Sequence, residues 1–219
     1  MNLHYETVSP LLKETLQKLV NSPIFKDFTL IGGTCLSLQL GHRRSIDIDL
    51  FTDIDYGTMN TKEMKEFIQR SFPYSENTDS LDTSALGYTL YMGDSPIDKI
   101  KVDFFYTEKF IFPIQEIDHI RIADIREIAA MKLSAITEEE PRQKDFWDIH
   151  ELNEKYSFKD MIDWGIKRNE WSVTEEGILN GFQKIDSVKE SPEGIKCQHY
   201  FFHCGRKRRI FIIVTRNRK

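Results

Sequence analysis

The run SIDIDLF, residues 45–51, places two aspartates in a segment that otherwise alternates like a strand. Because successive side chains of a strand point to opposite faces, Asp47 and Asp49 share one face and the apolar residues between them share the other. Aspartate is depleted in strands and is costly to bury without a partner. We therefore expect a compensating positive charge beside this strand, although an ordinary pair of solvent-facing acids would give the same pattern.

A glycine turn precedes this strand. The segment FTLIGG, residues 28–33, predicts a short strand that ends at Gly32 and Gly33, and TCLSLQL predicts a helix that begins at Thr34 and stops at Gly41. Backbone N–H groups at the start of such a helix are suited to bind phosphate. We therefore expect a triphosphate near Gly32, Gly33 and Thr34, although a simple strand-to-helix turn remains the alternative.

A third carboxylate comes from the segment KIKVDFF, in which Asp103 is flanked by apolar residues as in a strand. If this strand lies beside that of Asp47 and Asp49, all three carboxylates face one side. Mg²⁺ binds one or two protein carboxylates together with substrate phosphates, and two such ions about 4 Å apart promote phosphoryl transfer. We predict that Asp47, Asp49 and Asp103 hold two Mg²⁺ ions.

The order of predicted elements indicates a mixed α/β (α+β) protein with a small sheet flanked by helices, followed by a helical domain. We expect domains at residues 1–118 and 119–185 and a basic, solvated or disordered tail at 186–219. Helices are expected at 8–20, 34–40, 61–70, 124–137, 142–156, 157–169 and 174–185, and the later strands at 85–92 and 98–106.

Composition restricts the class of protein. Hydrophobic residues make up 40% of the chain and charged residues 30%, as in ordinary globular domains, and no apolar run has the length of about 18 residues that a membrane span requires. Three cysteines are too few for a disulfide framework. We expect a cytoplasmic protein without a membrane partner.

The quoted motifs, together with IREIAAMKLSAI and RQKDFWDIHEL, resemble the AbiEii/AbiGii toxin family of bacterial nucleotidyltransferases, within the DNA-polymerase-β-type superfamily. The resemblance covers roughly residues 25–155. It implies a minimal nucleotidyltransferase fold that uses Mg²⁺ to transfer a nucleotide from an NTP to an acceptor hydroxyl. It also implies a toxin paired with an antitoxin protein, with tRNA as a candidate acceptor.

By position, the resemblance assigns nucleotide binding to Gly33 and Thr34, and it adds Lys132 and Asp145 to the catalytic set. Lys132 interrupts an apolar helical stripe, so its ammonium must reach toward an anion, for which a triphosphate is suitable. Asp145 could orient Lys132 or act as a base. A snorkelling lysine and an exposed acid paired with Arg142 or Lys144 are the structural alternatives.

Two features stay open. Arg43, in the segment GHRR, either binds substrate phosphate or neutralises the carboxylates, and a solvated charge pair is an equal alternative. The tail 186–219 carries nine Lys/Arg against three acids, which favours a solvated segment over RNA binding. A zinc site in this tail is disfavoured because the spacing of its candidate ligands fits no common pattern; they are Cys197, His199, His203 and Cys204.

Two other functions remain possible from the sequence. One is a nucleotidyltransferase that modifies a small molecule such as an antibiotic. The other is a catalytically silent nucleotide-binding module that keeps the fold. The three carboxylates Asp47, Asp49 and Asp103 argue against a silent module.

Overall fold

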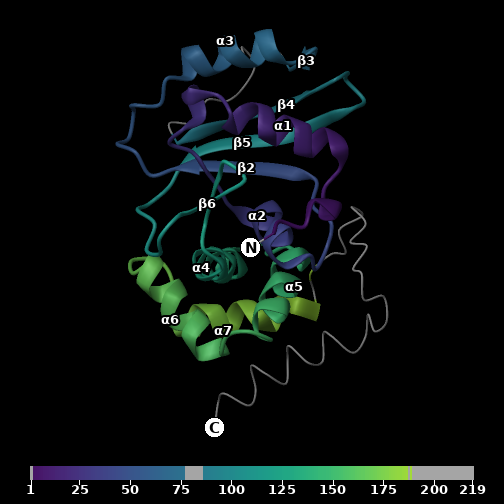
Figure 1. Ribbon diagram of the computed structural model, residues 1–219. Coiled ribbons are helices and arrows are strands. Elements are labelled where there is room, and N and C mark those ends of the chain that lie inside the picture. The colour runs from purple at the N-terminus through teal and green to yellow at the C-terminus, as the bar shows by residue number, and fades with distance from the viewer. Residues whose placement is uncertain (1, 77–85, 187, 189–219) are drawn as a thin grey trace. The chain divides into compact units, whose positions relative to one another are not determined.

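The computed structural model describes residues 2–76, 86–186 and 188 (Figure 1). The chain divides into two compact units, the first from Met1 to Asp124 and the second from Ile125 onward. The four candidate zinc ligands of the tail lie outside the described residues, as does nearly all of the basic tail. Each unit is described by itself.

The first unit is built on one mixed sheet. Seven strands of the described residues pair in the order β3-β4-β5-β2-β1-β7-β6 (Figure 1). β2 runs parallel to β5, and β4 runs antiparallel to β5. In chain order, the strands are β1 (Thr29–Leu30), β2 (Asp47–Thr52), β3 (Tyr74–Ser75), β4 (Gly87–Gly93), β5 (Lys99–Tyr106), β6 (Gln115–Ile117) and β7 (Ile120–Ile122).

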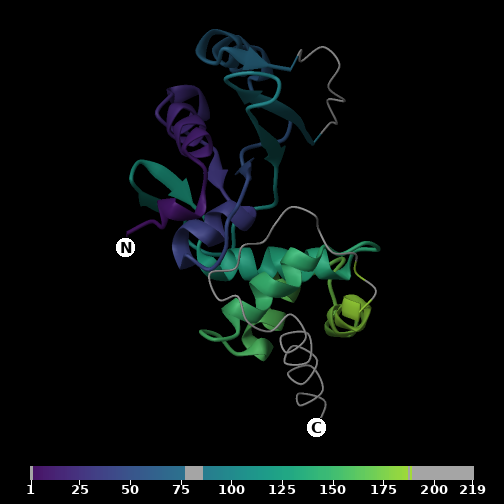
Figure 2. The ribbon, with the colours of Figure 1, turned by 90° about the vertical axis from the view of Figure 1, so that its right-hand side faces the viewer.

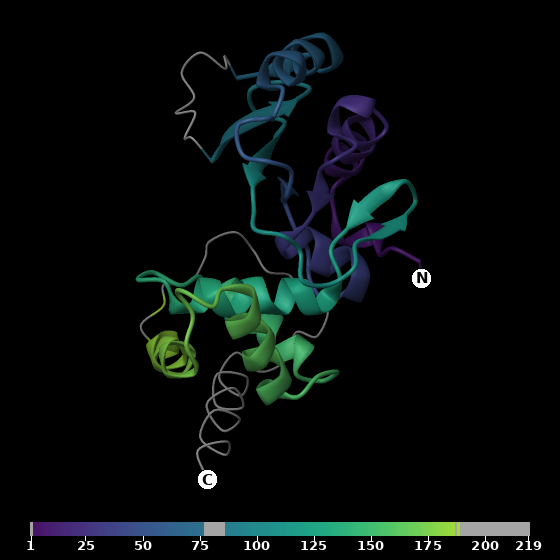
Figure 3. The same cartoon turned by 90° about the vertical axis from the view of Figure 1, so that its left-hand side faces the viewer.

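One face of the central strands forms the core of the first unit. Ile48 and Leu50 on β2 and Phe104 on β5 are fully buried on this face. Helix α1 (Pro10–Val20) contacts β2, β4 and β5, and it lies beside the sheet in Figure 2 and Figure 3. Phe25, just before β1, stacks on Phe104 with ring centroids 5.3 Å apart. The opposite face is consequently left to the alternate residues, which include the aspartates.

Local signals explain the helices of this unit. Ser9 caps α1 by accepting a hydrogen bond from the N–H of Leu12, and Asn60 caps α3 (Thr61–Ser71) through the N–H of Glu63. Helix α2 (Gly32–Leu40) begins at the first glycine of the turn and ends at Gly41, whose φ of 68° is a left-handed C-terminal stop.

The second unit is helical. Its helices are α4 (Ile125–Thr137), α5 (Gln143–Leu152), α6 (Phe158–Arg168) and α7 (Glu175–Gln183). Helix α4 contacts each of the other three, so it is the centre of this unit. A buried ion pair joins α4 to α6, because Arg168 Nε lies 2.9 Å from Glu127 Oε1.

The predicted α/β fold class is confirmed, with a small mixed sheet and a following set of helices. Residues 115–122 differ from expectation, because they form the hairpin β6–β7 and extend the sheet. Its turn uses Asp118 and His119 at φ values of 52° and 63° instead of glycine, so no turn signal marks it. None of the helices in the described residues has the length and apolar character needed to span a bilayer.

Candidate active site

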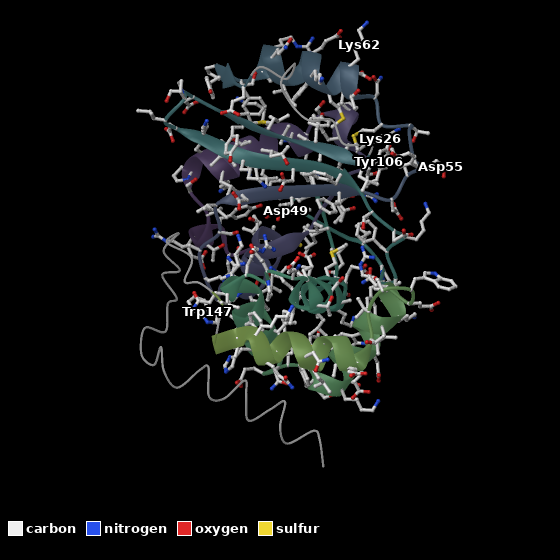
Figure 4. All side chains as sticks on the ribbon, turned by 180° about the vertical axis from the view of Figure 1, so that it is seen from behind. Lys26, Asp49, Asp55, Lys62, Tyr106 and Trp147 are labelled. Atoms are coloured by element: carbon white, nitrogen blue, oxygen red, sulfur yellow. The ribbon has the colours of Figure 1, made fainter. Side chains whose placement is uncertain are left out.

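The carboxylate of Asp49 lies against the glycine turn. Gly32 opens α2 with φ of +69°, and the N–H of Ile31 donates to the carbonyl of Asp49 at 2.9 Å. A Cβ atom on residue 32 would lie only 2.2 Å from Asp49 Oδ2. Both the backbone conformation and the close approach therefore require glycine. Figure 4 labels Asp49 along β2 and Tyr106 at the end of β5.

The second glycine is covered by an arginine. A Cβ atom on residue 33 would lie 2.3 Å from Arg43 Nη2, so the guanidinium lies directly over Gly33. Arg43 is buried, and its Nη1 donates to the carbonyl of Arg44 at 3.0 Å. The structure thus places the guanidinium of Arg43 at the start of α2, where the backbone N–H groups also favour an anion.

Thr34 connects the turn to the acidic strand. Its side chain is fully buried, and its hydroxyl lies within hydrogen-bond reach of Ser45 Oγ, at 2.8 Å, and of the carbonyl of Asp47. This hydroxyl is therefore used inside the protein, where it fixes the beginning of β2 against α2. Ser45 was not singled out from the sequence, because a serine before a strand carries no specific signal.

The three predicted metal ligands lie on neighbouring strands. Asp49 and Asp103 are register partners on the parallel strands β2 and β5, and Asp47 is aligned with Lys101. All three aspartates are half-buried on the face opposite the core. Thr89 on β4, the register partner of Asp103, donates its hydroxyl to Asp103 Oδ1 at 2.5 Å. The expected alignment of the acidic strands is therefore present.

Lys101 places a positive charge beside these carboxylates. Its ammonium pairs with Asp103 Oδ2. Burial lowers the pKa of Lys101, but the hydrogen bond to Asp103 and the charges of Asp103, Asp47 and Asp49 outweigh burial and raise it above the ordinary value. The field of the three carboxylates thus stabilises a cation on this face of the sheet.

The oxygen donors fit a divalent cation of the Mg²⁺ type, because such ions prefer carboxylate ligands and retain water. Within residues 2–76 and 86–186, no three His, Cys, Asp or Glu side chains are already gathered as a metal site. Asp103 instead faces Lys101 and Thr89. A metal ion bound by Asp103 would consequently compete with the ammonium of Lys101 for this carboxylate.

The second unit contains a charged cluster, formed by Lys132, Arg142, Asp145 and Asp148. Lys132 Nζ lies 2.6 Å from Asp145 Oδ1 and 2.8 Å from Asp148 Oδ2. Arg142 Nε lies 3.0 Å from Asp145 Oδ2. Lys132 and both aspartates are buried, so the ammonium is held between two carboxylates in a fixed position.

The surroundings of Asp145 favour one of its two predicted roles. Burial would raise the pKa of Asp145, but the charges of Lys132 and Arg142 outweigh burial and lower it below the ordinary value. A carboxylate with a lowered pKa is a weak base. The geometry therefore favours Asp145 as the residue that orients Lys132.

Sequence reasoning did not assign Thr89, Lys101 or Asp148 to these clusters. Lys101 stands two residues before Asp103 on one strand, and Asp148 stands three residues after Asp145 on one helix. Each spacing predicts a shared face and could have identified the residue. Thr89 carried no such signal, because strand pairing alone brings it to Asp103.

Comparisons with known proteins identify the family of this chain. Residues 14–173 match the family model for the nucleotidyl transferase AbiEii toxin of type IV toxin–antitoxin systems. An uncharacterised protein of Aquifex aeolicus, aq_aa25, is 33% identical over 173 residues, which cover 75% of this chain and 73% of that protein.

Two solved structures from Helicobacter pylori share the fold. One, assigned by inference to the nucleotidyltransferases, aligns with a TM-score of 0.62 at 14% identity, over 97% of this chain and 92% of its own. The other, JHP933, aligns with a TM-score of 0.55 at 17% identity, over 93% of this chain and 87% of its own. The predicted resemblance and enzyme class are confirmed: this chain is a member of the nucleotidyl transferase AbiEii toxin family.

Proposed function

We propose that the protein is the toxin of a toxin–antitoxin or phage-defence system and acts as a Mg²⁺-dependent nucleotidyltransferase. One observation carries the proposal: Asp49 is the register partner of Asp103 and also lies against Gly32 at the start of α2. Ligands for a cation and donors for a phosphate consequently occur in one place. This combination is what transfer of a nucleotide from an NTP requires.

In the proposed reaction, the N–H groups at the start of α2 and the guanidinium of Arg43 bind the triphosphate near Gly33. Asp47, Asp49 and Asp103 would hold Mg²⁺, which would supply Lewis-acid stabilisation of the phosphoryl oxygens. An acceptor hydroxyl attacks the α-phosphorus and loses its proton to water, the bond from the α-phosphorus to the oxygen of the β-phosphate breaks, and pyrophosphate leaves. Thr34 positions Asp47 through its carbonyl.

The family resemblance adds Lys132 to the residues that bind phosphate. Asp145 and Asp148 hold the Lys132 ammonium in one orientation, and a bound phosphate would compete with these two carboxylates for it. The acceptor is proposed to be tRNA, and the partner to be an antitoxin protein. Both follow from the resemblance to the family, whose name includes toxin–antitoxin systems.

A label-transfer screen tests the proposal. The protein is incubated with Mg²⁺ and each of the four α-³²P-labelled NTPs, against purified tRNA, total RNA and a set of small antibiotics. We expect label on tRNA from one or a few NTPs, and no label when EDTA is added. Label on an antibiotic alone would show that the acceptor is a small molecule and not tRNA. NTP binding without transfer to any acceptor would indicate a catalytically silent module.

A further inference from the structure

The acidic row is followed on the same face of the sheet by a pair of aromatic rings. Phe51 and Phe105 are register partners on β2 and β5, two residues beyond Asp49 and Asp103 on each strand. Because the spacing is two residues, the rings stand on the face that carries the carboxylates. The two ring centroids are 5.7 Å apart and the ring planes meet at 46°.

These rings are not part of the core on the other face. Leu50 and Phe104, their neighbours in sequence, are fully buried against that core, whereas Phe51 and Phe105 are half-buried. The other register partner of Phe105 is Gly87 on β4, which adds no side chain to this row. A Cβ atom on residue 87 would lie 2.8 Å from Phe105 Cδ1, so a larger residue there would displace the ring of Phe105.

We propose that Phe51 and Phe105 form a stacking surface for the nucleobase of a nucleotide whose phosphate or attacking hydroxyl lies at the Asp49–Asp103 row. This inference rests on the proposed function and names a further binding element of the same site. The two rows are about 7 Å apart along the strands, a span that a sugar can bridge between a phosphate and its base. Aromatic side chains bind bases of any sequence, because every base has a π face.

The base can come from the donor NTP, whose α-phosphate lies at the site of transfer, or from the acceptor nucleotide, whose attacking hydroxyl lies there. The two sources are distinguished by which constant changes. Phe51→Leu and Phe105→Leu remove a ring while keeping an apolar side chain of similar volume. Tyr56→Leu is the matched control, because Tyr56 and Tyr106 form a comparable pair, 5.2 Å apart and tilted by 49°.

The measurement uses the full chain and Mg²⁺. Calorimetry gives the affinity for each NTP and for inorganic tripolyphosphate, which has no base, and steady-state transfer gives the KM for the acceptor. We expect each Phe variant to weaken the binding of one nucleotide ligand, either the NTP or the acceptor, by about fivefold or more. The affinity for tripolyphosphate is expected to stay unchanged, as are all constants of the Tyr56 variant.

Weaker NTP binding assigns the surface to the donor, and a raised acceptor KM with unchanged NTP binding assigns it to the acceptor. Unchanged constants for both ligands would overturn the inference, as would an equal loss of tripolyphosphate binding. If the wild-type protein binds NTPs but transfers nothing, the proposed function fails, while calorimetry with the NTPs and the fluorescence measurement below, made with both the NTP and the acceptor nucleotide, still decide the stacking surface.

A second variant tests the surface without loss of a ring. Phe51→Trp places an indole at this position, and the fluorescence of the three native tryptophans is measured separately in the wild type. A stacked base quenches the added indole, so we expect extra quenching when the NTP or the acceptor nucleotide binds and none with tripolyphosphate. Equal quenching by wild type and variant would contradict the inference.

Discussion

Asp49 and Asp103 face each other as register partners on two parallel strands that are separated in sequence by the whole of α3, β3 and β4. Gly32, at the start of α2, lies at the same site, since a Cβ atom added to residue 32 would meet the Asp49 carboxylate. The candidate centre therefore depends on tertiary pairing and on one glycine, and both can be tested by substitution.

Gly32→Ala is expected to abolish nucleotide transfer, because the added Cβ atom would lie 2.2 Å from Asp49 Oδ2 in a backbone with φ of +69°. Gly57→Ala is the control, since Gly57 has φ of +83° but no atom within 4 Å of an added Cβ. Both should lose about 1 to 2 kcal/mol of stability from backbone strain. Transfer rates and thermal melts check this, and equal activity of the two variants would contradict the role of the close approach.

Lys101→Met is expected to lower the Mg²⁺ concentration that gives half-maximal transfer, because the ammonium of Lys101 competes for Asp103. A half-buried ion pair of this kind is worth up to about 1 kcal/mol, which corresponds to a shift of up to about fivefold. Lys99→Met is the control, since Lys99 pairs with Glu76 instead. An unchanged or higher Mg²⁺ requirement in the Lys101 variant would refute the competition.

Asp145→Asn is expected to destabilise the second unit at pH 7 by about 3 kcal/mol, because it leaves buried charges less well paired. The pKa of Asp145 is lowered in the folded state, so its contribution is present above the ordinary value of 3.8 and is lost as pH falls below it.

Denaturant unfolding at several pH values checks this. Between pH 5 and pH 2 the stability of the Asn variant should fall less than that of the wild type. The control is Asp163→Asn, which removes an exposed pair with Lys159. A parallel loss of stability in wild type and Asp145→Asn over this range would show that Asp145 is not the titrating group.

Cys35 is expected to resist alkylation in the folded protein. Burial raises the pKa of this thiol to about 12, so little thiolate exists at pH 8 and the sulfur is not exposed. The measurement uses Cys197→Ser/Cys204→Ser, in which Cys35 is the remaining cysteine, and follows iodoacetamide labelling by mass spectrometry. Rapid labelling without denaturant would contradict the buried position of α2.

The parts of the fold that could be predicted are those with a local signal. The alternation around Asp47 and Asp49, the glycine at position 41 and the helical stripe of α4 each specify an element through neighbouring residues. The hairpin β6–β7 was not predicted, because its turn residues, Asp118 and His119, adopt positive φ without glycine.

The residues that pair with the acids and with Gly33 could not be predicted in this way. Strand pairing brings Thr89 to Asp103 over fourteen positions, and only the register reveals it. The position of Arg43 over Gly33 likewise depends on how the segment before β2 returns to α2. Residue types and spacing therefore indicate which acids belong to the candidate centre, whereas their neutralising and orienting partners depend on tertiary structure.

The most direct test of the catalytic role of the acidic row compares label transfer by wild type and Asp47→Asn/Asp49→Asn, with Asp53→Asn/Asp55→Asn as a control of equal charge change outside the row. We expect loss of transfer by at least about a thousandfold in the first double variant, because these carboxylates are proposed to hold the metal ions. Its thermal melt should remain cooperative, and the control should transfer at nearly the wild-type rate. A wild-type rate of transfer from folded Asp47→Asn/Asp49→Asn would contradict the assignment of the active site.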